Sequence, residues 1–109
     1  MSAFGYDPRQ IIMIYRPQRE RMGTEMVMHE EYVQTASCMF YEGTPRVLNA
    51  DPIGRIVQRR GSAVCSNKTV DIQMGDSVRM SDGTWFSVVA PPSYAAGVAF
   101  FLEERPLHE

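Results

Sequence analysis

The side chains that could perform acid–base or nucleophilic chemistry are few in this sequence. The two histidines are His29, which is followed by two glutamates, and His108, next to the last residue. His29 and Glu31 could form an acid–base pair on one strand face, although a solvated polar face is the commoner arrangement. Motifs of serine hydrolases, zinc proteases, P-loops and dinucleotide-binding folds are missing. We therefore expect no catalytic residues, no cofactor and no enzyme activity.

The cysteines Cys38 and Cys65 lie far apart in the sequence. With the two histidines they could supply a Cys2His2 set, but the closely spaced ligand pairs of zinc sites are absent. We expect no metal site, and we interpret both cysteines as buried free thiols on strands.

Positive charge is concentrated in residues 43–61. This segment is rich in glycine and proline, and besides one acid, Asp51, it contains Arg46, Arg55, Arg59 and Arg60. Its composition predicts a long basic loop with at most a short helix, around 47–50 or 55–60. Such arginines could contact a DNA phosphate backbone without reading bases. Alternatively, they could be solvated or pair with acids of a neighbouring subunit.

Length and composition describe one ordinary domain. The chain has 109 residues and a formal net charge of −2, with 44% hydrophobic and 22% charged residues. No apolar run approaches the roughly 20 residues of a membrane span, and no signal peptide is visible. The near-neutral charge argues against wholesale coating of nucleic acid. We expect a single domain over residues 1–109 and no membrane partner.

The elements that must position these side chains are strands. Residues 25–41 fit either one long, bent strand or a hairpin pair, and Asp82-Gly83 between alternating runs is a strong hairpin signal. The other predicted strands are 11–16, which Pro17 would end, 62–65, the alternating run 68–72, 77–80, 85–89 and 98–102. About six or seven short strands without a long helix predict a mainly β fold, a small antiparallel β-barrel or sandwich.

Trp85 and Phe86 follow the predicted tight turn. If their strand alternates, one of the two rings must face outward. The outward ring could be an anchor at a subunit interface, or it could cover the end of the barrel.

Three runs together resemble the head–tail joining proteins of long-tailed bacteriophages, also called head-closure, head completion or stopper proteins. The first run is the opening strand at 12–17 with its charged, glycine-containing turn, and the second is 32–40. The third is the hairpin region 70–89, with Gly75-Asp76 before one strand and Asp82-Gly83 before the next. The resemblance covers most of residues 10–104, whereas 43–61 has no matching motif.

This resemblance implies a small β-barrel that assembles with itself into a ring of sixfold or twelvefold symmetry. In that family the ring lies below the portal and adaptor proteins, closes the DNA-filled head and docks the tail-terminator or tail tube proteins. By the same resemblance we expect a virion protein at the head–tail interface, assembled in the host cytoplasm. The arginines of 43–61 would face the channel lumen and the end of the packaged DNA.

The same resemblance suggests where subunits would meet. The N-terminal arm at residues 1–9, with Phe4 and Tyr6, could reach across to a neighbour, and Trp85 is a further candidate for the interface.

Two alternatives remain on the sequence alone. Within virion assembly, the chain could be a connector adaptor or a tail-terminator ring protein. Outside it, the chain could be an SH3-like barrel that binds nucleic acid, which would require a basic face and salt-dependent binding.

Overall fold

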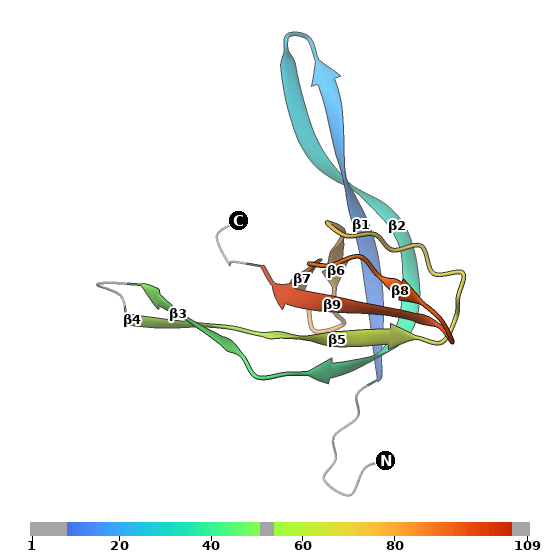
Figure 1. The fold of residues 1–109 in the computed structure, drawn as a ribbon. Coiled ribbons are helices and arrows are strands. Elements are labelled where there is room, and N and C mark those ends of the chain that lie inside the picture. Colours follow the sequence, from blue (N-terminus) through green and yellow to red (C-terminus); the bar gives the residue numbers. More distant parts are fainter. Residues whose placement is uncertain (1–8, 51–53, 106–109) are drawn as a thin grey trace, which may run out of the picture.

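The structure is a computed structural model, and it describes residues 9–50 and 54–105. All regular elements in these residues are β-strands, so the predicted mainly β fold is confirmed (Figure 1). The strands are β1 (Arg9–Met22), β2 (Glu25–Glu42), β3 (Arg46–Ala50), β4 (Gly54–Gln58), β5 (Arg60–Cys65), β6 (Ser77–Arg79), β7 (Trp85–Val88), β8 (Ser93–Tyr94) and β9 (Val98–Glu104).

Six of these strands close into a ring. The main sheet has the order β5-β2-β1-β6-β7-β9-β8, and β5 also pairs with β9. All of its pairings are antiparallel, and the closing one places Ala63 opposite Phe100. Closure removes the unpaired edges that an open sheet would expose. The result is a small, barrel-like body.

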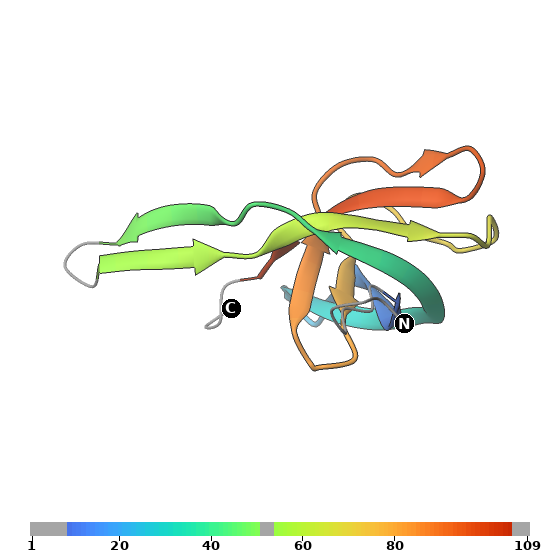
Figure 2. The ribbon, with the colours of Figure 1, turned by 90° about the horizontal axis from the view of Figure 1, so that it is seen from below.

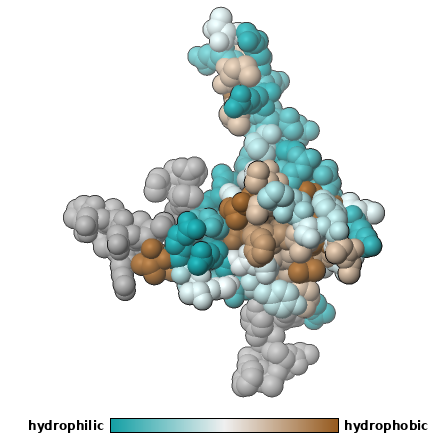
Figure 3. All heavy atoms as spheres, viewed as in Figure 1, coloured by the Kyte–Doolittle hydropathy of each residue, from teal (hydrophilic) through white to brown (hydrophobic). Residues whose placement is uncertain are grey.

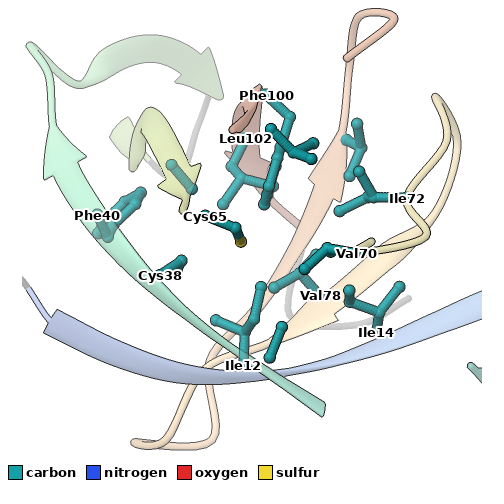
Figure 4. Close-up of a cluster of buried hydrophobic side chains, with 14 of the residues drawn as sticks. Ile12, Ile14, Cys38, Phe40, Cys65, Val70, Ile72, Val78, Phe100 and Leu102 are labelled. Atoms are coloured by element: carbon teal, nitrogen blue, oxygen red, sulfur yellow. The ribbon is translucent and has the colours of Figure 1, made fainter. Parts of the chain in front are cut away.

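The hydrophobic core fills the inside of this ring (Figure 4). Along β9, Val98, Phe100 and Leu102 are buried, whereas Phe101 between them is 60% exposed. This alternation places every second side chain in the core. The largest fully buried side chains also include Ile12, Ile14, Ile72, Val78, Phe86 and Val88. Each large apolar side chain that becomes fully buried contributes roughly 1.5–3 kcal/mol.

The first two strands extend beyond the body as a long two-stranded ribbon (Figure 1). β1 was predicted to end at Pro17, but it continues to Met22. β6 pairs with β1 only from Met13 to Tyr15, so one side of β1 is without a neighbouring strand at Pro17. A proline is tolerated in such an edge position because no ladder hydrogen bond is lost. Of the two alternatives for 25–41, the structure has the single long strand.

The segment 43–61 differs from the predicted loop, because β3 and β4 form a second hairpin within it. Val47 lies opposite Val57 in this hairpin. The hairpin extends away from the body (Figure 2). Pairing between its strands satisfies backbone groups that an irregular loop would leave to water. With this hairpin, nine strands form in the described residues rather than six or seven. The alternating run 68–72, in contrast, forms no strand, because the chain from 66 to 76 pairs with no neighbouring strand.

The predicted Asp82-Gly83 turn is confirmed between β6 and β7. Gly83 has a φ of 91°, a left-handed conformation that favours glycine. The Thr84 N–H donates to the Asp82 carboxylate at 2.9 Å, and the Met80 N–H donates to the Thr84 carbonyl at 2.9 Å. The turn therefore has both the backbone angles and the hydrogen bonds that its sequence calls for.

Candidate interaction surfaces

The arginines of 43–61 contact groups of their own chain. Arg59 donates from Nε and Nη2 to the two carboxylate oxygens of Glu42, at 2.9 and 3.1 Å. These hydrogen bonds raise the pKa of Arg59, and burial opposes them in part. Arg46 forms an ion pair with Glu103 at 3.2 Å. Arg60 donates from Nε to the backbone carbonyl of Thr44 at 2.9 Å.

The fourth arginine, Arg55, belongs to β4 and lies opposite Asn49 in the second hairpin. The sequence predicted solvated arginines or pairing with a neighbouring subunit, and the structure instead supplies partners within the chain for Arg46, Arg59 and Arg60. The acids that pair with two of them, Glu42 and Glu103, lie outside 43–61. The segment taken by itself therefore has more basic than acidic residues. A DNA-facing role for the four arginines stays a prediction.

Trp85 lies on the outer side of the ring, and Phe86 is fully buried. The prediction that one of the two rings faces outward is thereby confirmed. The Trp85 ring packs on Tyr15, with ring centroids 5.1 Å apart. The guanidinium groups of Arg105 and Arg79 lie 5.3 and 6.0 Å from its centroid. The Trp85 ring thus has three contact partners within its own chain, and a role at a subunit interface stays a prediction. The other two interface candidates, Phe4 and Tyr6, lie outside the described residues.

A polar cluster anchors the base of the β1–β2 ribbon beside Trp85. Arg105 donates from Nη1 to Glu30 at 3.3 Å and to the Ser77 hydroxyl at 3.2 Å. The Ser77 hydroxyl in turn donates to Glu30. Charge-assisted hydrogen bonds of this kind hold geometry better than neutral ones. They tie β2 at the base of the ribbon to β6 and to the residue that follows β9.

An open hollow of about 480 Å³ lies on the outer surface next to β5 and β9. It is lined by Tyr41 of β2, Gly61 of β5, Val89 just after β7 and Phe101 of β9, together with their neighbours. Phe101 is 60% exposed. Figure 3 shows hydrophobic residues gathered over this part of the body. Apolar surface of this kind is a candidate contact area for another macromolecule.

The residues considered for chemistry are spread over the molecule. His29 lies on the ribbon, and its Nδ1 is 3.6 Å from a carboxylate oxygen of Glu20 on the opposite strand. The acid near its ring is therefore Glu20 rather than the Glu31 considered from the sequence. Within the described ranges, no three or more His, Cys, Asp or Glu side chains gather in a way that could hold a metal ion. No helix in the described part of the chain is long and apolar enough to span a membrane.

Cys38 and Cys65 are buried free thiols, as the sequence predicted. They belong to the paired strands β2 and β5 and lie side by side in the core (Figure 4). A hydrogen bond to Cys65, together with burial, raises the pKa of the Cys38 thiol. The same hydrogen bond lowers the pKa of the Cys65 thiol, and burial opposes this lowering. Both side chains are shielded from solvent in the core.

Comparison with known proteins finds a likeness among solved structures but none among family models or curated sequences. No protein-family model matches the chain, and no curated protein matches its sequence. Among solved structures, the phage-like element PBSX protein xkdH from Bacillus subtilis matches with a TM-score of 0.61 and 13% sequence identity. The match covers 93% of this chain and 96% of that one. The two chains share a fold. The likeness extends over nearly the whole length of both chains and is not limited to one part of the fold.

Proposed function

We propose that this chain is a structural protein of a phage or phage-like particle, and specifically a head–tail connector protein of the stopper kind. In this role it forms a ring below the portal and adaptor, closes the DNA-filled head and docks the tail. The observation that carries the proposal is the shared fold with the PBSX protein over 93% of the chain. The sequence resemblance to head–tail joining proteins points in the same direction.

The distribution of surface features supports work by contact. The closed ring offers few free edges for strand addition, so contacts between subunits must use projections and side-chain surfaces. Two hairpins and an outer area around Phe101 supply these surfaces. Exposed apolar side chains on the hairpins include Met22, Met26, Met28, Val47 and Val57. Methionine adapts its shape to a partner more readily than branched side chains do.

The test is to deplete the protein during growth of the phage, or induction of the prophage, that encodes it. Electron microscopy of the particles should show heads that have lost DNA, alongside normal free tails. Full, stable heads with tails of irregular length would overturn the stopper role in favour of a tail terminator. Heads that retain the portal but lack every later connector component would favour an adaptor.

For the second hairpin, we propose a position facing the channel, near the end of the packaged DNA. The ion pairs of Arg46 and Arg59 hold the base of this hairpin against the body. Limited proteolysis of the free protein and of assembled particles tests this position. Protection of residues 47–57 in particles supports it, and equal cleavage in both samples overturns it.

Binding of nucleic acid by the isolated chain is the competing function. Its arginine-rich segment has Arg46 and Arg59 in ion pairs with acids, which lowers the net positive charge that DNA would meet. We therefore expect the isolated protein to show only weak, nonspecific binding to duplex DNA. Tight binding with a steep salt dependence would contradict the stopper proposal and favour the nucleic-acid module.

A further inference from the structure

The outer half of the β1–β2 ribbon has two faces of opposite charge. Directly opposite residues of an antiparallel pair share a face, and neighbours along a strand alternate. Arg19 lies opposite Met28, and Arg21 lies opposite Met26. These four residues make one side, the basic face.

The other side is formed by the alternate positions. Glu20 lies opposite Val27, and Met22 lies opposite Glu25. These four residues make the acidic face. Nearer the body, Gln18 and His29 continue the acidic face.

Both faces are open in the single chain. Met22, Met26 and Met28 are 59%, 55% and 59% exposed, and Val27 is 39% exposed. On the face that it draws, Figure 3 shows apolar surface among hydrophilic surface toward the tip of the ribbon. Each face thus combines apolar side chains with charges of a single sign.

The charges at the tip lack strong partners. Arg19, Arg21 and Glu25 make no side-chain hydrogen bond or ion pair with any residue in the described ranges. Glu20 has only His29, at 3.6 Å. Closer to the body the situation differs, because Arg16 and Glu30 are already bound, to Asp76 and Arg105 respectively. Arg19, Arg21 and Glu25 thus remain unpaired in the projecting part of the ribbon, whereas these two charges at its base are paired.

An isolated two-stranded ribbon is only marginally stable in water, and it is stabilised when a partner covers it. The partner that fits the basic face must present acidic side chains next to apolar ones, at the spacing of alternate residues along a strand. The acidic face of the same ribbon has this composition. A contact between two identical faces would instead bring like charges together, which costs free energy.

We propose that the basic face of one copy packs against the acidic face of the next copy, so that the ribbons stack face to face. The contact is heterologous, with different surfaces on its two sides, and repetition of such a contact closes into a ring when the rotation between copies allows it. The inference rests on the proposed ring-forming function and names the surfaces that would join its subunits.

The test uses charge reversal with complementation, read out by analytical ultracentrifugation of the purified chain. One variant carries Arg19→Glu and Arg21→Glu, so both of its faces are acidic. The other carries Glu20→Arg and Glu25→Arg, so both of its faces are basic. We expect each variant alone to self-associate at least about tenfold more weakly than wild type. An equimolar mixture should recover wild-type association, because each acidic face then meets a basic face.

The control is Lys68→Glu, which reverses one charge on an exposed loop away from the ribbon, and it is compared with Arg19→Glu alone, which changes the net charge by the same amount. The Lys68→Glu variant should associate like wild type. Added salt should weaken association of the wild type, because the charges involved are exposed. Restoration by mixing cannot arise from misfolded variants, so complementation would show that both variants are folded. Urea denaturation of each variant alone, with a cooperative transition, verifies folding before the mixture is measured.

Several outcomes would overturn the inference. Variants that associate as wild type does, a mixture that stays as weak as its components, or a wild-type chain that stays monomeric at every concentration would each do so. A basic-face variant that loses DNA binding, with association unchanged, would assign the face to DNA instead. The proposed function is tested separately, by particle morphology after depletion, so either proposal can fail while the other stands.

Discussion

Arg16 on β1 binds the buried carboxylate of Asp76 through two hydrogen bonds, from Nε at 3.0 Å and from Nη2 at 2.9 Å. Asp76 is 1% exposed and also accepts the Gln73 N–H at 2.8 Å. The same guanidinium reaches Asp71 at 3.2 Å. The pKa of Arg16 is raised, first by its hydrogen bond to Asp76 and then by that to Asp71. This clamp holds the strandless segment 66–76 against the ribbon strand.

The two acids bound by Arg16 should contribute very differently to the free energy of unfolding. Asp76→Asn should lower the free energy of unfolding by about 3 kcal/mol, because it leaves part of a buried charge pair uncompensated. Asp71→Asn is the matched control, since Asp71 is 55% exposed on the same arginine, and it should cost less than about 1 kcal/mol. Urea denaturation measures both. Equal losses in the two variants would show that burial of Asp76 does not govern the clamp.

A second prediction concerns the close approach of β5 to β2. A Cβ added at Gly61 would lie 2.5 Å from the Tyr41 carbonyl oxygen and 2.9 Å from the Phe40 ring. Gly61→Ala should therefore destabilise the fold by about 1–3 kcal/mol, because backbone must shift. Gly43→Ala is the control, with its nearest atom, the Arg60 carbonyl oxygen, at 3.7 Å. Thermal unfolding compares the two variants, and a Gly61→Ala protein as stable as Gly43→Ala would contradict the packing described.

The hydrogen bonds of Asp82 in its turn predict how the stability of the fold depends on pH. Hydrogen bonds from the backbone and side chain of Thr84 lower the pKa of Asp82 below its ordinary value of 3.8. A carboxyl with a lower pKa in the folded state stabilises the fold above its unfolded pKa, and this contribution is lost as the pH falls through the folded value. The stability difference between wild type and Asp82→Asn should therefore be constant above about pH 5 and shrink below about pH 4.

Urea midpoints measured across this range check the effect. Ser81→Ala, in the same turn but without a carboxyl, should give a difference from wild type that does not change with pH. A difference for Asp82→Asn that persists unchanged at the lowest pH would show that the charge of Asp82 does not stabilise the turn.

The two core cysteines should be protected from thiol reagents. Cys38 and Cys65 are 4% and 0% exposed, and the pKa of Cys38 is raised by its hydrogen bond to Cys65 and by burial. The folded protein should react with a chromogenic disulfide reagent only as fast as it unfolds, and both thiols should titrate in urea. Rapid reaction of either thiol without denaturant would mean that the core opens at β2 and β5.

The outer ribbon should be dispensable for folding of the body. No described side chain within 19–28 makes a hydrogen bond or ion pair outside the ribbon. Replacing 19–28 by Asn-Gly, a two-residue hairpin turn between Gln18 and His29, should shift the melting temperature by less than about 5 °C. Self-association should be lost in sedimentation experiments. Loss of the folded state would show instead that the ribbon stabilises the barrel-like body.

Parts of the fold can be read from local sequence. The alternation in 98–102 and the Asp82-Gly83 turn both predict elements that the structure contains, because strand periodicity and turn dihedral preferences act over a few residues. The hairpin inside 43–61 was missed, since Gly54 and two prolines in a short segment are typical of a loop. Its apolar pairs, such as Val47 with Val57, become visible only once the pairing register is known.

The sequence by itself determined that this is a mainly β domain whose inside is built from alternating apolar residues, and that its basic charge gathers in one segment. Only the tertiary structure decided what those charges do. Arg59 meets Glu42, and Arg46 meets Glu103, across 17 and 57 positions of the chain. Such partners are brought together by the ring closure of β5 on β9 and by the β2–β5 pairing. Electrostatic contacts depend on distance in space, and local sequence contains no record of that distance.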